Sequence, residues 1–183
     1  MLKRNVIASG ITNLTDARYF ASYGVDYLLF DLREIGINDI MAITGWLEGV
    51  KILIKMNEEN IHLIDEVLVR ISPFAIGSSK SECLRKILQY TSDGYIFHIF
   101  PADTSENTKV VLTHVDFVNP DTFHIDSQST TQAFLEVNPT EEDITEFLNK
   151  SEAGVILKGS SEIETGLKSF DNMDLLFEIL EEN

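Results

Sequence analysis

Short apolar segments alternate with helical segments along the chain, and this alternation restricts the folds that the chain can adopt. The first unit shows the pattern: Val6-Ile7-Ala8 predicts a buried strand, Gly10 a turn, and Asn13 a helix N-cap with Asp16 three residues later. Gly24 ends that helix, and a second apolar strand follows it. Repeated strand–helix units are typical of a parallel sheet covered by helices, so the sequence predicts the α/β class.

The same unit recurs toward the C-terminus. Further strands are predicted at Val25–Phe30, Val50–Met56, Ile71–Ile76, Tyr95–Phe100, Ala133–Val137 and Val155–Leu157. Further helices are predicted at Asn38–Leu47, after Asn57, at Ser81–Gln89, after Thr140 and after Asp171. Eight such units form a (β/α)8 TIM barrel, which normally takes about 250 residues. Because the chain has 183 residues, we expect a trimmed barrel forming one domain, residues 1–183. An open doubly wound sheet is the alternative.

The trimmed part of the barrel is predicted around strand six, which has two candidate positions. Val115–Asn119 is one and Thr122–Asp126 is the other. A parallel crossover needs a dozen or more residues before strand seven, and only the first candidate leaves that many. We therefore favour Val115–Asn119. The competing arrangement is an antiparallel hairpin across Ser127–Gln132, and in both arrangements helix six is missing or vestigial.

A missing helix would leave part of the barrel wall uncovered. Apolar side chains there, Phe117 or Phe134, would then be exposed. Large exposed apolar patches usually mark interfaces, so the sequence suggests self-association as a homodimer. The net charge of −16 opposes that association, so the interface would have to be mainly apolar.

The acidic composition also limits the partners of the protein. A net charge of −16 argues against nucleic acid and anionic membrane, because both are polyanions. No apolar run reaches the roughly 20 residues that a membrane crossing needs. The single cysteine, Cys83, fits a reducing cytoplasm. His62, His114 and His124 have no metal-ligand spacing, and we expect neither a metal nor a cofactor.

Two segments at opposite ends of the chain resemble one enzyme family. Ser9-Gly10-Ile11-Thr12-Asn13-Leu14-Thr15-Asp16-Ala17, followed by Gly24-Val25-Asp26, is similar to the opening of phosphoribosylanthranilate isomerase. Ser160-Ser161-Glu162-Ile163-Glu164 is similar to that family's Ser-Ser-Gly-Val-Glu segment. The resemblance implies a TIM barrel and an Amadori aldose–ketose isomerisation in tryptophan biosynthesis.

The resemblance also identifies the positions of the catalytic groups. The family's catalytic base is a cysteine at the end of strand one, and this chain has Ser9 there. The family's acid is an aspartate at the end of strand six, where this chain has either Asn119 or Asp126. A serine hydroxyl is a much weaker base than a thiol, so the family activity is expected to be impaired.

The substrate positions depart from the family in the same way. Arg33 is the one cation available for the substrate carboxylate, and Ser160 and Ser161 match the family's phosphate segment. Glu136 and Glu162 stand where the family has glycines that approach the phosphate, and a carboxylate there would repel a dianion. The sequence thus leaves two hypotheses: a divergent isomerase, or a binding or scaffold barrel that takes a non-phosphorylated small molecule.

Overall fold

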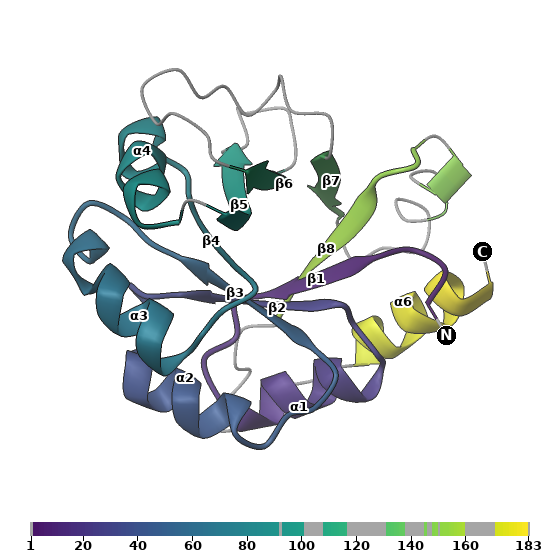
Figure 1. Ribbon diagram of the computed structural model, residues 1–183. Helices are drawn as coiled ribbons and strands as arrows, with labels where there is room; N and C mark the ends of the chain where they lie inside the picture. Colours follow the sequence, from purple (N-terminus) through teal and green to yellow (C-terminus); the bar gives the residue numbers. More distant parts are fainter. Residues whose placement is uncertain are drawn as a thin grey trace.

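Eight strands close into a barrel in chain order, as the computed structural model in Figure 1 shows. The structure describes residues 2–91, 93–100, 108–116, 131–137, 145, 148–149, 151–159 and 171–182. The strands are β1 Val6–Ser9, β2 Tyr27–Asp31, β3 Lys51–Lys55, β4 Ala75–Ser78, β5 Asp93–Phe100, β6 Lys109–Asp116, β7 Thr131–Glu136 and β8 Gly154–Lys158. The predicted barrel is confirmed, and the open sheet is wrong, because β8 pairs with β1.

Helices cover the outside of the barrel, mainly along β1 to β4 (Figure 1). They are α1 Leu14–Ser22, α2 Ile37–Thr44, the 3-10 helix η1 Ile61–Leu63, α3 Ile64–Arg70, α4 Ser81–Tyr90 and α6 Asp171–Glu182. No helix in these described ranges combines the length and apolar character needed to cross a membrane.

The helix boundaries follow local capping chemistry. Asn13 caps α1 as predicted, since its side-chain oxygen accepts a hydrogen bond from the Asp16 amide at 2.9 Å. The helix predicted to start at Asn38 instead has Gly36 as its N-cap. The strand predicted at Ile71–Ile76 starts later, at Ala75, because Ile71 still donates its amide to Val67 and closes α3.

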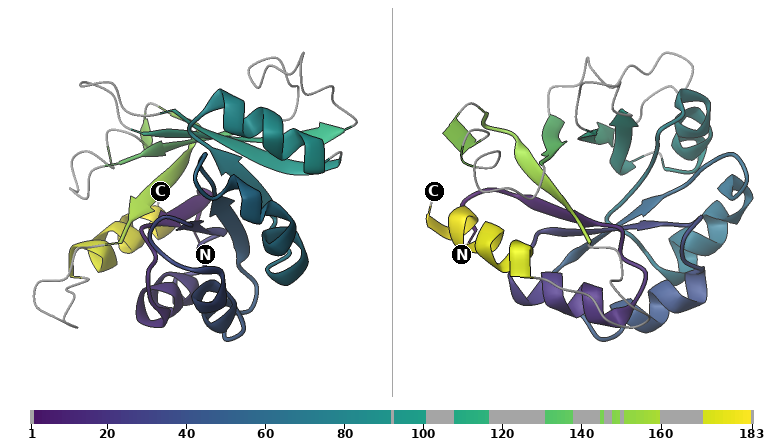
Figure 2. Two further views of the ribbon diagram at one scale, coloured as in Figure 1. Left: turned by 90° about the vertical axis from the view of Figure 1, so that its left-hand side faces the viewer. Right: turned by 180° about the vertical axis from the view of Figure 1, so that it is seen from behind.

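The favoured strand six, Val115–Asn119 in a parallel sheet, is wrong in position and in direction. The competing antiparallel arrangement is right in direction, but Thr131 and Gln132 lie in β7 and not in its turn. The observed β6 is antiparallel to β5, from Asp93 opposite Asp116 to Phe100 opposite Lys109, and it is also antiparallel to β7. Residues 101–108 connect β5 to β6, which suffices for an antiparallel pair but not for a helical crossover. Figure 2 shows β5, β6 and β7 running together on the side of the barrel away from α1 and α2. The carboxyl end of β6 therefore lies at the opposite end of the barrel from the carboxyl end of β1.

The barrel interior is a packed apolar layer. Side chains alternate between the lumen and the helices along each strand, so every second residue points inward. The buried lumen side chains include Leu53, Phe97, Phe134 and Ile156. Phe134 is fully buried, so the prediction that it is exposed on a bare wall is wrong. Phe117 and residues 119–130 of the Asn119–Gln132 region, where helix six was predicted to be missing or vestigial, lie outside the described residues.

Aromatic rings close the amino end of the barrel. Phe74 stacks on Tyr95 with ring centroids 4.5 Å apart and also contacts Tyr27. The Lys51 ammonium lies 4.7 Å from the centroid of the Phe74 ring. The lumen is filled in its middle and these rings cover part of its amino end, whereas the carboxyl end is where TIM barrels usually bind their ligands.

The two ends of the chain are joined on the outside of the barrel. The hydroxyls of Tyr19 on α1 and of Tyr23, its C-cap residue, both donate to one carboxylate oxygen of Asp174 on α6, at 2.5 and 2.7 Å. These hydrogen bonds lower the pKa of Asp174. The ring of Tyr23 also stacks on Phe177 at 4.1 Å. The contacts hold α6 against α1, beside the seam where β8 meets β1.

Candidate functional site

A ring of polar side chains stands at the carboxyl end of the barrel, one step above the apolar layer. Each member lies two residues after an apolar lumen residue on the same strand, and so it points into the same lumen. The members, called the polar ring below, are Ser9, Asp31, Lys55, Glu136 and Lys158. They come from five different strands, and the barrel rather than the local sequence brings them together.

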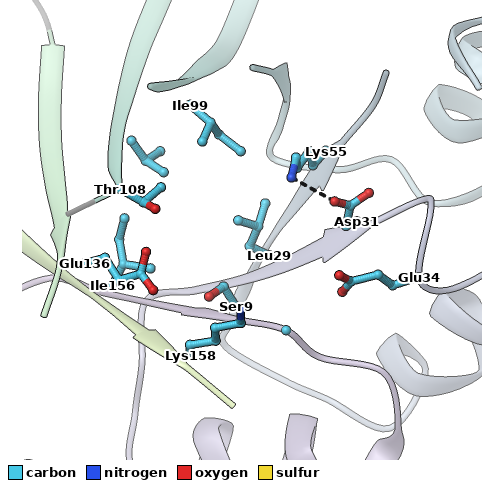
Figure 3. Close-up of a pocket in the computed structure, with 12 residues that line it drawn as sticks. Ser9, Leu29, Asp31, Glu34, Lys55, Ile99, Thr108, Glu136, Ile156 and Lys158 are labelled. Carbon is cyan, nitrogen blue, oxygen red and sulfur yellow. Dashed lines mark ion pairs between the residues drawn. The ribbon is translucent and has the colours of Figure 1, made fainter. Parts of the chain in front are cut away.

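The polar ring encloses a cavity of about 160 Å³ (Figure 3). Its floor is apolar and consists of the buried side chains Leu29, Ile99, Val110 and Ile156. Gly10, Glu34 and Thr108 complete the lining at the rim. An apolar floor with a few polar groups at the rim is the composition expected of a small-molecule site.

Asp31 forms the one ion-pair network of the described cavity lining. It is the cross-strand partner of Lys55, whose ammonium lies 2.8 Å from the Asp31 carboxylate. The Arg33 guanidinium approaches the same carboxylate at 2.6 Å from outside the cavity. Burial acts to raise the pKa of Asp31, but the hydrogen bonds from Arg33 and Lys55 outweigh it and lower the pKa from 3.8 to about 2.

Arg33, the predicted cation for a substrate carboxylate, is thus occupied by Asp31. Both its Nε and its Nη2 donate to that carboxylate, and its backbone amide donates to Asp31 as well. Arg33 is exposed and does not line the cavity. Its present contacts indicate that it holds Asp31 in place, while its predicted contact with a substrate stays a prediction.

Ser9 lies in the cavity wall at the end of β1, opposite Lys158 on β8. Its hydroxyl donates to the backbone carbonyl of Leu157 at 3.3 Å. Gly159, the residue after β8, donates its amide to the Ser9 carbonyl at 2.9 Å. In the described part of the chain no histidine or carboxylate forms a hydrogen bond with the Ser9 hydroxyl, so no base is in place to activate it.

Glu136 and Lys158 reach the cavity from the neighbouring strands β7 and β8. Glu136 is the cross-strand partner of Ile156, two residues before Lys158. Neither side chain forms an ion pair with any residue that the structure describes, whereas the Lys55 ammonium does. The stem of Lys158 passes over Gly10, where an added Cβ would lie 3.5 Å from the lysine Cγ.

The structure brings two of the predicted site residues, Ser9 and Glu136, into one cavity. The other predicted residues, Asn119, Asp126, Ser160, Ser161 and Glu162, lie outside the described residues. The assignment of an acid to the end of strand six assumed a parallel strand, and that premise is wrong because β6 is antiparallel. Within the described ranges, no three His, Cys, Asp or Glu side chains are grouped so as to hold a metal ion.

Asp31, Lys55 and Lys158 were missed as cavity residues from the sequence. Lys55 was placed inside a predicted strand and Lys158 just beyond one. Their spacing could have identified them. Each is the last residue of its strand and lies two positions after an apolar lumen residue. Recognising that spacing requires knowing which face of each strand points inward.

The Asp31 network should make the protein less stable in acid. Because the folded pKa of about 2 lies below the ordinary 3.8, the stabilisation is fully present above about pH 5 and is lost as the pH falls toward 2. Asp31→Asn should lower the free energy of unfolding near pH 7 by about 1–2 kcal/mol, a modest loss because Arg33 is solvent-screened. It should also reduce the difference in stability between pH 7 and pH 3.

Urea unfolding at both pH values measures this effect. Glu48→Gln is the matched control, because Glu48 is exposed and does not line the cavity. An Asp31→Asn protein as stable as the control near pH 7 would show that the ion pairs do not stabilise the barrel.

Solved structures of one enzyme family share this fold. Phosphoribosyl anthranilate isomerase from Thermus thermophilus matches with a TM-score of 0.65 at 17% identity, over 97% of this chain and 98% of that one. A phosphoribosyl anthranilate isomerase holding reduced 1-(O-carboxyphenylamino)-1-deoxyribulose 5-phosphate matches with the same score and identity, over 98% and 100%. No protein-family model and no curated protein matches the sequence. At this identity the likeness shows the fold.

Proposed function

We propose that this protein is a ligand-binding barrel with the phosphoribosylanthranilate isomerase fold, that it does not carry out the isomerisation, and that its cavity takes a small non-phosphorylated molecule. The lining of the cavity carries the proposal. The lining holds three carboxylates, Asp31, Glu34 and Glu136, against two ammonium groups, so it is net negative. Like charges a few ångströms apart in a partly buried site cost several kcal/mol, so this lining opposes a phosphate dianion.

The hydrogen bonding of Ser9 supports the loss of chemistry. An Amadori isomerisation needs a general base to move a proton, and Ser9 stands at the position of the family's cysteine base. Its hydroxyl proton is directed at the Leu157 carbonyl rather than at a side-chain base. A serine in that arrangement is not activated for proton transfer.

The size of the cavity supports a small ligand. A cavity of about 150 Å³ holds one molecule of benzene, and the cavity here measures about 160 Å³. The ligand in the isomerase complex above combines a carboxyphenyl ring, a deoxyribulose chain and a phosphate. Such a molecule exceeds the space that the described residues enclose.

The alternative is a divergent isomerase acting in tryptophan biosynthesis. The segments Ser9–Ala17 and Ser160–Ser169 favour it, because they resemble the family's sequence at both ends of the chain. A fluorescence assay with phosphoribosylanthranilate, together with complementation of a strain lacking the isomerase, distinguishes the two functions.

We expect no turnover and no complementation, and we expect Ser9→Cys to restore neither. A correctly placed base cannot act on a substrate that does not bind. Turnover by the wild-type protein would overturn the proposal outright. Turnover by Ser9→Cys alone would show that the cavity accepts the phosphorylated substrate and that only the base was lost.

Three further expectations remain predictions. They are the single-domain organisation of residues 1–183, a location in the cytoplasm, and a homodimer. The dimer no longer has Phe134 to support it, because that ring fills the barrel lumen. An interface on this acidic chain would strengthen with ionic strength.

A further inference from the structure

The charges around the cavity fall into a satisfied group and an unsatisfied group. Asp31 is neutralised by Lys55 and Arg33, at 2.8 and 2.6 Å. Lys158 and Glu136 form no ion pair with any residue in the described ranges, and neither does Glu34. Lys158 and Glu34 are exposed and Glu136 is partly buried, so all three charges are open to a ligand that enters at the carboxyl end of the barrel. The side chains without an ion pair carry charges of both signs, so a single ligand that carries a positive and a negative charge would pair with both.

The position of these groups separates the two ends of such a ligand. Lys158 enters at the end of β8, while Glu136 enters one strand away on β7, opposite Ile156. Figure 3 shows Glu136 and Lys158 as separate side chains on one side of the cavity, with Glu34 on the other. An anionic group beside Lys158 and a cationic group beside Glu136 would each find a charge-assisted hydrogen bond.

The floor of the cavity indicates the chemical character of the rest of the ligand. Leu29, Ile99, Val110 and Ile156 are all buried aliphatic side chains. They favour contact with an apolar group, and the volume of about 160 Å³ limits that group to a few carbon atoms.

We infer that the cavity binds a zwitterion of the size of an aliphatic α-amino acid, with its carboxylate at Lys158, its ammonium at Glu136 and its side chain on the apolar floor. This inference rests on the proposed binding function of the same cavity. It adds the ligand class: both charges are required, and the net negative lining, in which Glu34 and Glu136 have no ion-pair partner among the described residues, opposes a phosphate.

Calorimetric titration of the intact protein tests the inference, with L-leucine as the probe. Isocaproate keeps the carboxylate and the aliphatic chain of leucine without the amine, and isoamylamine keeps the amine without the carboxylate. We expect leucine to bind at least tenfold more tightly than either analogue. Inorganic phosphate should not bind.

Two charge-removing variants make the assignment of each end testable. Lys158→Met should weaken the binding of leucine at least tenfold and leave the affinity for isoamylamine unchanged, because isoamylamine has no carboxylate. Glu136→Gln should weaken the binding of leucine by a similar factor and leave the affinity for isocaproate unchanged, because isocaproate has no amine. Lys80→Met and Glu48→Gln are the matched controls, since both residues are exposed and outside the cavity lining, and they should bind leucine as the wild-type protein does.

Each other outcome has a definite meaning. If the amine or the carboxylate alone binds as tightly as leucine, the zwitterion is wrong while a non-phosphorylated ligand site stands. If leucine does not bind, or if Lys158→Met and Glu136→Gln both bind it with the affinity of the wild-type protein, the inference is overturned. If phosphate binds and Glu136→Gln strengthens it, both the inference and the proposed function are overturned, because the cavity is then an anion site.

Discussion

Replacing Gly77 by alanine should lower the free energy of unfolding by about 3 kcal/mol or more, or prevent folding. Gly77 lies in β4 and is the cross-strand partner of Phe97 in β5. A Cβ at Gly77 would lie 2.1 Å from the Phe97 carbonyl oxygen and 2.4 Å from atoms of its ring. Neither group can give way, because the carbonyl belongs to the barrel backbone and the ring is fully buried in the lumen.

Gly36→Ala is the control for this substitution. Gly36 caps α2 with an ordinary negative φ of −79°, and an added Cβ would meet only the Asp39 carboxylate, at 3.6 Å. Gly36→Ala should lower the free energy of unfolding by less than about 1 kcal/mol. Urea unfolding followed by circular dichroism measures both variants. Equal losses at the two glycines would mean that β4 and β5 are not packed as described.

Replacing Phe134 by alanine should cost about 3–5 kcal/mol, because it opens a cavity in the middle of the lumen. The Phe134 ring is fully buried and meets Tyr27 edge-to-face at 5.6 Å. Gly154 on β8 leaves room for it, since a Cβ there would lie 2.4 Å from the Phe134 ring. The ring thus joins β7 to both β2 and β8.

Leu175→Ala is the matched truncation outside the barrel. Leu175 lies on α6 and is 44% exposed, so its loss should stay below about 1 kcal/mol. Thermal and urea unfolding of the two variants compare the sites directly. If Phe134→Ala lowers the free energy of unfolding no more than Leu175→Ala does, Phe134 is not buried in the lumen and lies on an exposed barrel wall, as the sequence suggested.

The parallel part of the barrel could be predicted from the sequence because its signals are local. Asn13 and Gly24 mark the ends of α1, and apolar runs mark β1 to β5, β7 and β8. The direction of β6 could not be predicted in this way. Its residues, Lys109–Asp116, carry a strand pattern, but alternation is the same whether a strand runs parallel or antiparallel to its neighbour. The direction is decided by the short connection from β5.

The candidate site was predicted in part for a related reason. Ser9 and Glu136 came from comparison with a family pattern, and both line the cavity. Lys55 and Lys158 lie outside the segments that were compared, and their roles depend on which strand face points inward. That face follows from the closed barrel and its register rather than from either residue's neighbours in the sequence.

Binding of a small non-phosphorylated zwitterion in the carboxyl-end cavity can be observed by methyl-resolved NMR of the protein titrated with L-leucine. We expect saturable shifts of the methyl signals of Leu29, Ile99, Val110 and Ile156, with contacts from the leucine methyls to that floor. Shifts confined to methyl groups outside the cavity, or no shifts at saturating leucine, would contradict this binding.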